Sequence, residues 1–598
     1  MTNSTTITTP DWVPDAVFYQ IFPDRFARSG RVAAQNLESW DSPPTRHGFK
    51  GGNLWGVLEK LDYLQDLGVN ALYFCPVFQS AANHRYHTHD YAQVDPLLGG
   101  NEALRALLDA AHARGMRVVL DGVFNHASRG FFQFNHILEN GPASPYVNWF
   151  SVKGYPLRAY IRKKRPKYAC WWGNRELPEF NTANPAARAF LLDVARRWIE
   201  FGIDGWRLDV PSEIDDDAFW YEFRRVVKAA NPQAYIVGEI WDEGQRWLQG
   251  NQFDAVMNYV WSRAVLNFTL GRKLPAKLRP GDREIKPTNA RQFAAEIERI
   301  LALHPRAITY AQLNALGSHD TARFLTLAQG KTARLKLATL LLMTYPGAPC
   351  IYYGDEIGLQ GGPDPACRAA FIWDEARWDL SLLAYVRRLI ALRHKLPPLR
   401  RGDLVSLYAD PEQNVYALAR RYQGETVLVA VNCGDQTFER PLPAADTGWP
   451  DGTRLADRLS DKTSAEVRDG EIVGLGLAPL SGAVLSPPTR SAPQELADIQ
   501  APWYLYLLAC ADGVTYAGIT TDPRRRLAEH NAGRGARFTR PKKRRPARIL
   551  GCWRFPDRSS ATRAELRFKR LRAARKRRLA AERLCFEGAP FCDEFVRD

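Results

Sequence analysis

Two side chains of opposite charge lie two residues apart in the stretch 201–210, which reads FGIDGWRLDV. Arg207 and Asp209 follow an apolar run and a glycine turn, and side chains two apart on a strand project from the same face. The guanidinium would then lie beside the carboxylate, lower its pKa and keep it ionised. Taken alone, such a pair is more often a surface ion pair, so its role depends on the other reactive residues.

More carboxylates and imidazoles stand at the ends of other short apolar runs. These polar residues are Asp121, Asn125, His126, Glu239, His319 and Asp320. Converging carboxylates are what cleavage of a glycosidic bond requires, because one acts as nucleophile or base and another, kept protonated, acts as acid. Asp209 is the candidate nucleophile, and Glu239, next to apolar Ile240 and Trp241, is the candidate acid.

A scaffold must bring these run ends together. Eight apolar runs alternate with amphipathic helical stretches, and this pattern predicts an α/β fold, a (β/α)8 TIM barrel with catalytic groups at the carboxyl ends of its strands. The expected strands are Val17–Phe22, Val69–Phe74, Arg117–Asp121, Ile203–Arg207, Tyr235–Glu239, Phe253–Met257, Gln312–Gly317 and Pro349–Tyr353. The expected helices include Leu104–Ala113, Pro185–Phe201 and Ala218–Ala230.

The chain is predicted to hold several domains. The stretch 127–184 is too long for a plain loop, so we expect a small inserted B subdomain after the third strand. Beyond residue 396 the helical period is lost, and 414–422 and 425–432 are expected to pair as antiparallel strands. The expected organisation is 1–396 for the barrel with its insertion, 397–488 for an antiparallel β-sandwich, 489–501 for a Pro/Ser-rich linker and 502–598 for a small α+β domain.

Composition limits the class of protein. The chain has 598 residues, 45% of them hydrophobic, and no apolar run is long enough to cross a bilayer. The polar stretch 1–14 lacks the features of an export signal, so we expect a cytoplasmic protein with no membrane partner. The nine cysteines are scattered and follow no zinc-binding spacing, which favours reduced thiols.

Positive charge is concentrated at the C-terminal end. Residues 503–598 hold 24 lysines and arginines against 10 acidic residues, which is 14 of the 16 net positive charges of the chain. The rest of the chain is therefore nearly neutral. Such asymmetry predicts a separate basic domain whose partner is DNA or RNA.

The barrel motifs resemble those of the α-amylase superfamily of retaining glycosidases, glycoside hydrolase family 13, over roughly 15–488. The matching segments are Asp121-x-x-x-Asn125-His126, Gly205-x-Arg207-x-Asp209, Gly238-Glu239-Ile240-Trp241, His319-Asp320 and Gly347-x-Pro349-x-Ile351-Tyr352-Tyr353-Gly354. The resemblance implies Asp209 as nucleophile, Glu239 as acid/base and Asp320 as the carboxylate that grips the sugar ring. It implies substrate binding by His84, Tyr86, His126, Arg207, Trp241 and His319.

Gly238–Trp241 and Leu177–Asn181 are most similar to the neopullulanase, cyclomaltodextrinase and maltogenic amylase branch. This implies double displacement on α-1,4-glucans such as maltooligosaccharides, cyclomaltodextrins or pullulan, with transglycosylation as an alternative outcome. Residue 318 is Ser where Asn is commoner, and the loop 27–41 lacks the Asn/Asp-rich run that often binds calcium. We therefore expect no required cofactor for the glycosidase, with calcium as the alternative.

The basic domain resembles the GIY-YIG nuclease fold over 503–579, with the family triplets altered to Tyr504-Leu505-Tyr506 and Tyr516-Ala517-Gly518. The implied site residues are Tyr506, Tyr516, Gly518, Arg526, His530 and Glu565. Glu565 would hold Mg²⁺ or another divalent ion, and Arg526 would stabilise the phosphate, while the tyrosines and His530 would help to activate water. Alternatively, Glu565 and Lys569 form an ordinary helix ion pair, and the domain binds without cutting.

Two functions stay open at this point. The first is an α-glucan hydrolase that carries a nucleic-acid module. The alternative is a nucleic-acid binding protein or nuclease whose barrel is secondary or inactive, although the presence of all three catalytic carboxylates argues against an inactive barrel. The sequence fixes neither the oligomeric state nor the reason for joining the two domains.

Overall fold

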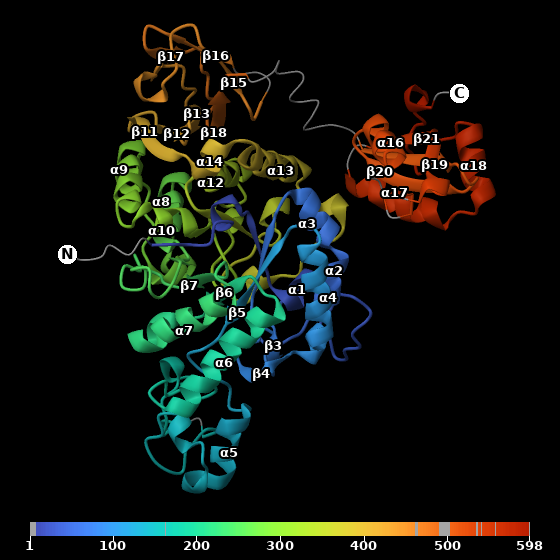
Figure 1. The fold of residues 1–598 in the computed structure, drawn as a ribbon. Helices are drawn as coiled ribbons and strands as arrows, with labels where there is room; N and C mark the ends of the chain where they lie inside the picture. Colours follow the sequence, from blue (N-terminus) through green and yellow to red (C-terminus); the bar gives the residue numbers. More distant parts are fainter. Residues whose placement is uncertain are drawn as a thin grey trace. The chain divides into compact units, whose positions relative to one another are not determined.

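The computed structural model describes residues 7–161, 163–460, 464–488, 503–533, 536, 538–539, 541–555 and 558–596. The chain divides into two compact units, Met1–Pro487 and Pro488–Asp598 (Figure 1). The predicted linker at 489–501 lies outside the described residues. No helix of the described ranges is long and apolar enough to cross a membrane.

The first unit is built around a ring of eight parallel strands. They are β1 (Phe18–Ile21), β2 (Ala71–Phe74), β5 (Arg117–Gly122), β6 (Gly205–Leu208), β7 (Tyr235–Gly238), β8 (Ala255–Val256), β9 (Leu313–Ala315) and β10 (Ala348–Tyr352). Their order is β8-β7-β6-β5-β2-β1-β10-β9, and a parallel bridge between Met257 and Leu313 joins the two ends. The predicted (β/α)8 barrel is confirmed, and each expected strand overlaps an observed one.

Strand residues alternate between the inside of the barrel and the surrounding helices. Phe18, Tyr73, Val119, Val237 and Leu313 belong to one inner cluster. Their neighbours along the strands belong to a second, larger cluster shared with the helices. Because successive side chains point to opposite faces, the polar residues two positions beyond the inner residues also point inward, at the carboxyl end of the barrel.

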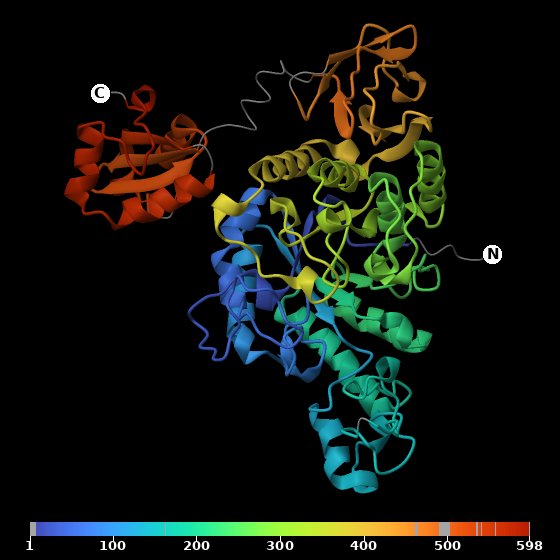
Figure 2. The same cartoon turned by 180° about the vertical axis from the view of Figure 1, so that it is seen from behind.

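Helices surround the barrel on its outside (Figures 1 and 2). Helix α6 begins after Asn184, whose side chain accepts the N–H groups of Ala186 and Ala187, and it ends at Gly202 in a left-handed conformation. The helices of this unit are α1 (Pro23–Phe26), α2 (Leu54–Glu59), α3 (Leu61–Leu67), α4 (Gly100–His112), α5 (Phe132–Asn140), α6 (Pro185–Phe201), α7 (Asp217–Ala230), α8 (Tyr259–Thr269), α9 (Ala290–Leu301), α10 (Arg306–Ala311), α11 (Phe324–Leu327), α12 (Thr332–Thr344), α13 (Leu380–Lys395) and α14 (Pro397–Arg401).

Two additions extend the barrel. The insertion 127–184 carries α5 and an aromatic cluster of Phe131, Phe134, Phe150 and Phe180, and it projects from the barrel as a lobe of its own in both views. Preceding it, β3 (Phe78–Ser80) and β4 (Thr88–Val94) form a short hairpin ladder. The insertion is therefore held by packed side chains, as a small core requires.

An antiparallel sheet follows the barrel. Its strands are β11 (Asp403–Asp410), β12 (Val415–Tyr422), β13 (Glu425–Asn432), β14 (Leu442–Pro443), β15 (Arg454–Asp457), β16 (Ser464–Arg468), β17 (Glu471–Val473) and β18 (Ser481–Ser486). β11 and β14 end the strand order but contact one another, so the sheet curls around a core of its own. The two strands predicted at 414–422 and 425–432 are confirmed as a pair.

The described residues of the second unit form a three-stranded antiparallel sheet with three α-helices. The strands β19 (Trp503–Cys510), β20 (Thr515–Thr520) and β21 (Pro546–Phe555) lie in the order β20-β19-β21, and the helices are α16 (Pro523–Asn531), α17 (Arg558–Arg570) and α18 (Ala573–Ala581). Strands β19 and β20 pair as an antiparallel hairpin, and the Asp522 side chain caps α16 by accepting the Arg525 N–H. Strand β21 was missed, because its first half stands within a run of basic residues that reads as a loop.

Candidate active site

Arg207 is the centre of the barrel site. It is fully buried, and its Nη1 donates to both oxygens of Asp121 at 2.9 and 3.0 Å and to Asp209 Oδ1 at 3.3 Å. Its Nη2 lies 3.0 Å from Glu239 Oε2. One guanidinium therefore contacts carboxylates from three neighbouring strands.

Strand register explains this convergence. Asp121 of β5 is the register partner of Arg207 of β6, and both project into the barrel. Beyond the strand ends, the Asp209 N–H donates to Gly122 O at 3.0 Å and the Glu239 N–H to Leu208 O at 2.9 Å. The ladders thus continue far enough to hold both carboxylates over the same opening.

Glu239 is oriented by two N–H donors. The Val210 N–H donates to Oε2 and the Trp241 Nε1–H to Oε1, each at 3.1 Å. Val210 has φ of 35°, in the left-handed region that a β-branched residue rarely adopts. The strained residue directly follows Asp209, and its conformation directs the Val210 N–H to the Glu239 carboxylate. The backbone strain therefore lies at the candidate active site.

Burial decides the titration of the two carboxyl groups. Burial, reinforced by the Glu239 charge, raises the pKa of Asp209 well above its usual range, and Arg207 opposes this only in part. Burial also raises the pKa of Glu239. Arg207 lowers the pKa of Asp209 as predicted, but burial and the Glu239 charge raise it by more, so the prediction that Asp209 is held ionised by a lowered pKa is wrong. The two neighbouring charges repel each other, which disfavours ionisation of both groups at once.

His319 and Asp320 follow β9 and face the same opening. Gln20 Nε2 donates to His319 Nδ1 at 2.8 Å, so the proton of the neutral imidazole lies on Nε2, which is 2.6 Å from Tyr86 Oη. Tyr86 donates to Asp121 at 2.9 Å. Burial opposes ionisation of Asp320, but His319 and Arg368 together lower its pKa, and Arg368 donates to Oδ1 at 3.1 Å.

The predicted sugar-binding residues lie around this cluster. His126 stacks on Trp171 with ring centres 5.4 Å apart, and its buried Nε2 has no hydrogen-bond partner within the described ranges. Burial lowers the pKa of His126 to about 3, so its neutral ring has one unused polar atom for a ligand hydroxyl. His84 accepts the Tyr86 N–H at 3.2 Å, and Trp241 stacks on Tyr259 at 3.9 Å.

Sequence reasoning missed several participants. Asp121 was quoted as part of a motif but given no role, although it makes the closest contacts of Arg207. Its position at a strand end was the signal. Gln20 and Arg368 carry no such signal, because Gln20 lies inside β1 and Arg368 lies in the long segment after β10.

A buried lysine from outside the loop 27–41, in which no calcium site is expected, bonds to the end of that loop. Lys50 Nζ donates to Ser39 O, Ser42 O and Ser42 Oγ at 2.5–2.7 Å and lies 3.4 Å from Glu38 Oε2. Carbonyl, hydroxyl and carboxylate oxygens are the ligands that calcium prefers. Here the ammonium group lies among them, so these oxygens do not fit a divalent ion.

In the second unit, Tyr506 and His530 form a buried pair. Thr539 Oγ1 donates to Ala536 O, so His530 Nδ1 donates to Thr539 Oγ1 at 2.6 Å and Nε2 accepts from Tyr506 Oη at 3.0 Å. Burial and the Arg526 charge lower the pKa of His530 to about 4, which keeps the ring neutral. The imidazole can therefore receive the tyrosine proton.

The remaining predicted residues of this unit surround the pair. Gly518 is the register partner of Tyr506, and an added Cβ would lie 2.6 Å from Tyr506 Oη, so only glycine leaves room for the ring. Tyr516 packs 5.1 Å from His530 between ring centres. Arg526 is paired with Glu529 at 2.5 Å. The structure therefore brings the expected residues of β19, β20 and α16 together.

Burial raises the pKa of Tyr506 and Tyr516, and the charge of Glu565 on α17 adds to both increases. Its carboxylate pairs with Lys569 Nζ at 2.8 Å, as the ordinary ion-pair reading expects. The described residues contain no group of three His, Cys, Asp or Glu side chains placed to hold a metal ion. A single carboxylate still fits Mg²⁺, which keeps several waters and completes its shell with substrate phosphates.

Comparison with known proteins follows the division into units. The family model described as "Alpha amylase, catalytic domain" matches residues 20–379, more than half of the chain. The chain belongs to the α-amylase family of glycoside hydrolases. Cyclomaltodextrinase of Geobacillus thermopakistaniensis (strain MAS1) is 43% identical over 73% of this chain and 71% of that protein.

Other members of the α-amylase family show the same relationship. Neopullulanase 2 of Thermoactinomyces vulgaris is 44% identical over 72% of this chain and 71% of that protein. The crystal structure of a debranching enzyme from Nostoc punctiforme superimposes with a TM-score of 0.74 at 48% identity, covering 81% of this chain and all of that one. The family model "GIY-YIG catalytic domain" matches residues 502–578, so the second unit carries a GIY-YIG domain.

Proposed function

We propose that this glycoside hydrolase cleaves α-1,4-glucosidic bonds with retention of configuration. The observation that carries the proposal is the single buried guanidinium of Arg207, which contacts both Asp209 and Glu239 at the carboxyl ends of adjacent strands. Retaining glycosidases need two carboxyl groups about 5–5.5 Å apart with different protonation. Burial raises the pKa of Glu239, which favours the protonated form that the acid step requires.

Asp209 attacks the anomeric carbon while Glu239 protonates the departing glycosidic oxygen. The bond from carbon to leaving group breaks as the bond to Asp209 Oδ forms. Glu239, now ionised, then takes a proton from water or from a sugar hydroxyl, whose oxygen displaces Asp209. The N–H groups of Val210 and Trp241 hold the Glu239 carboxylate in one orientation. The same oxygen atoms can therefore donate the proton in the first step and accept it in the second.

Other residues position the sugar and exclude water. The unused Nε2 of His126 can bind a ring hydroxyl, and Asp320, ionised through His319 and Arg368, can accept hydrogen bonds from two hydroxyls. Hydrogen bonds from neighbouring hydroxyls to a fixed carboxylate resist the ground-state chair and favour distortion. These contacts carry the binding roles that we propose for His126, His319 and Asp320.

The proposed substrates are maltooligosaccharides, cyclomaltodextrins and pullulan. The relatives named cyclomaltodextrinase, neopullulanase and maltogenic amylase support this choice. The test is product analysis on maltotriose, a cyclomaltodextrin and pullulan, with the product anomer followed by proton NMR. We expect α-configured products first. Products of inverted configuration, or cleavage of none of the three substrates, would overturn the proposal.

We also propose that the second unit binds DNA or RNA and cleaves it with Mg²⁺. The surplus of 14 positive charges supports binding, and the buried Tyr506–His530 pair beside Arg526 and Glu565 supports cleavage. When bound, Mg²⁺ supplies charge neutralisation at a phosphate, and Glu565 would hold it. Nicking of a plasmid in Mg²⁺ but not in EDTA is the expected result. Binding without nicking would leave the domain a binding module.

Two further assignments are proposed. The relative named intracellular maltogenic amylase supports a cytoplasmic location. The ammonium of Lys50 among the oxygens of the 38–42 loop supports a glycosidase that needs no calcium. Hydrolysis rates that are equal in EDTA and in calcium are the expected result for the second assignment.

A further inference from the structure

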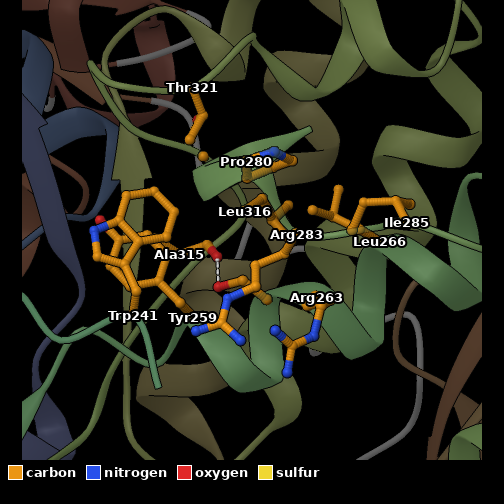
Figure 3. A pocket seen from close by; sticks show the side chains of 12 residues that line it. Trp241, Tyr259, Arg263, Leu266, Pro280, Arg283, Ile285, Ala315, Leu316 and Thr321 are labelled. Atoms are coloured by element: carbon orange, nitrogen blue, oxygen red, sulfur yellow. Dashed lines mark hydrogen bonds between the residues drawn. The ribbon is translucent and has the colours of Figure 1, made fainter. Parts of the chain in front are cut away.

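A pocket opens beside Trp241, on the side of the acid/base Glu239 (Figure 3). Trp241 donates to Glu239 Oε1 and stacks on Tyr259 of α8, and the floor is formed by residues that follow β9. The opposite wall is the segment 280–285, whose Gly281 approaches Trp241 so closely that a Cβ would lie 2.4 Å from the indole. The pocket is therefore joined to the catalytic site through one side chain.

Two arginines lie at one edge of this pocket. Arg263 stands one helical turn after Tyr259 on α8, and Arg283 comes from the facing segment. Figure 3 shows both side chains reaching the same edge of the pocket. Burial and the Arg283 charge both lower the pKa of Arg263, as expected for two cations that line the same pocket.

The acidic side chains around these arginines are already paired. Glu243 and Glu296 act on Arg263 from a distance but bind Arg299, at 2.5 and 2.9 Å. Glu284 pairs with two lysines, Lys273 and Lys286. Within the described side chains, neither Arg263 nor Arg283 has a carboxylate within 4.0 Å. Two adjacent cations without a counter-charge repel each other, and a bound anion removes that repulsion.

We propose that Arg263 and Arg283 form a phosphate-binding subsite on the leaving-group side of the active site. Planar guanidinium groups match the geometry of phosphate oxygens and can each donate two hydrogen bonds. The neighbouring walls, Leu266, Pro280, Ile285 and Leu316, are mostly apolar. Such a pocket suits a phosphate group, either free or carried by a sugar whose ring lies against the walls.

The role of this subsite rests on the proposed glucan hydrolase, but phosphate binding can be tested independently of it. Calorimetric titration with inorganic phosphate measures binding without any turnover. We expect the double variant Arg263→Gln/Arg283→Gln to bind phosphate at least about 10-fold more weakly than the parent enzyme, since it removes both charged hydrogen-bond donors of the subsite. Arg291→Gln, which removes an exposed arginine of α9, is the matched control and should bind phosphate as the parent does.

A second arm separates the two sources of phosphate. Transfer from maltotriose to glucose is compared with transfer to glucose 6-phosphate, in the parent enzyme and in the double variant. Preference for the phosphorylated acceptor, lost in the double variant, supports a sugar phosphate. Phosphate binding without that preference supports free phosphate. Equal phosphate binding by the parent and the double variant, or none by the parent, overturns the subsite; failure to cleave maltotriose in the parent instead overturns the proposed function.

Discussion

The two candidate sites of this chain differ in how their charges are paired. In the barrel, Arg207 is fully buried and contacts three carboxylates that belong to the site itself. In the GIY-YIG domain, Arg526 is bound by Glu529 and Glu565 by Lys569, with side chains 31% and 15% exposed. The barrel site is assembled before substrate arrives. If the second site works as we propose, it exchanges these internal ion pairs for a phosphate and a metal ion.

This difference sets the size of the effects expected from substitution. Charges fixed in a water-excluded site act at low effective dielectric and need no reorganisation during the reaction. Charges that are half exposed and paired with neighbours are screened by solvent. Losses in the barrel should therefore exceed losses in the GIY-YIG domain.

Asp209→Asn tests the barrel side of the comparison. The amide cannot form the bond to the anomeric carbon, so hydrolysis of maltotriose should fall by about 10⁴-fold. The measurement is the initial rate of glucose and maltose release. Asp215→Asn changes an exposed carboxylate two residues before α7 and is the control. It should retain the parent rate. A rate for Asp209→Asn within tenfold of the parent would mean that the nucleophile is another group.

Glu565→Gln tests the second site. Loss of a direct metal ligand should exceed the 10–100-fold effect of losing a residue that only orients a ligand, so Mg²⁺-dependent nicking should fall by at least about 100-fold. DNA affinity should stay the same or rise, because one negative charge is removed from a basic surface. Gel-shift titration at two salt concentrations measures it. Glu582→Gln, at a surface ion pair of α18, is the control and should nick DNA as the parent does. Unchanged nicking in Glu565→Gln would show that Glu565 does not bind the metal ion.

Much of the barrel site was predictable because its residues stand where apolar runs end. Asp209, Glu239 and Asp320 follow three strands of the ring, and parallel strands bring their carboxyl ends to one edge. The pKa direction of Asp209 was not predictable, since it depends on how Arg207 is divided between three partners. The burial of Asp209 and the sharing of Arg207 between carboxylates are properties of the packed structure. Neighbouring residues in the sequence do not indicate them.

The second site was predictable in its residues but less so in its architecture. Tyr506 and Gly518 stand opposite one another because the hairpin register places them there, and the turn at 512–513 fixes that register. Strand β21 was hidden by the basic residues at its start, although Ile549 packs in one core cluster of the domain and Trp553 and Phe555 pack in the other. Long-range pairing overrode a local signal.

Lys50→Met tests whether a protein cation replaces a metal ion in the barrel unit. The variant leaves Ser39 O and Ser42 O without their donor and Glu38 without its cation, and removal of one member of a buried ion pair destabilises a fold by about 4 kcal/mol. We expect a lower urea midpoint for the barrel unit, followed by tryptophan fluorescence. Lys277→Met changes an exposed lysine of the same unit and serves as the control. An unchanged midpoint would show that the 38–42 loop does not depend on this ammonium group.

Glu356→Gln probes the stability side of the barrel's buried charges. Burial raises the pKa of Glu356 to about 7, while its Oε1 accepts from Tyr19 and Tyr63 at 2.8 and 2.6 Å. The folded state therefore holds a proton that the unfolded chain releases near pH 4.5, so stability from this group is full below that pH and is lost as pH rises through 7.

Between pH 5 and pH 8 the parent should lose about 3 kcal/mol of unfolding free energy through Glu356. The glutamine keeps an acceptor for both tyrosines and has no proton to lose, so Glu356→Gln should match the parent at pH 5 and exceed it at pH 8. Urea midpoints at the two pH values measure the difference. Parallel pH dependences would mean that Glu356 is ionised in the folded barrel, and that burial alone does not set the protonation of its carboxyl groups.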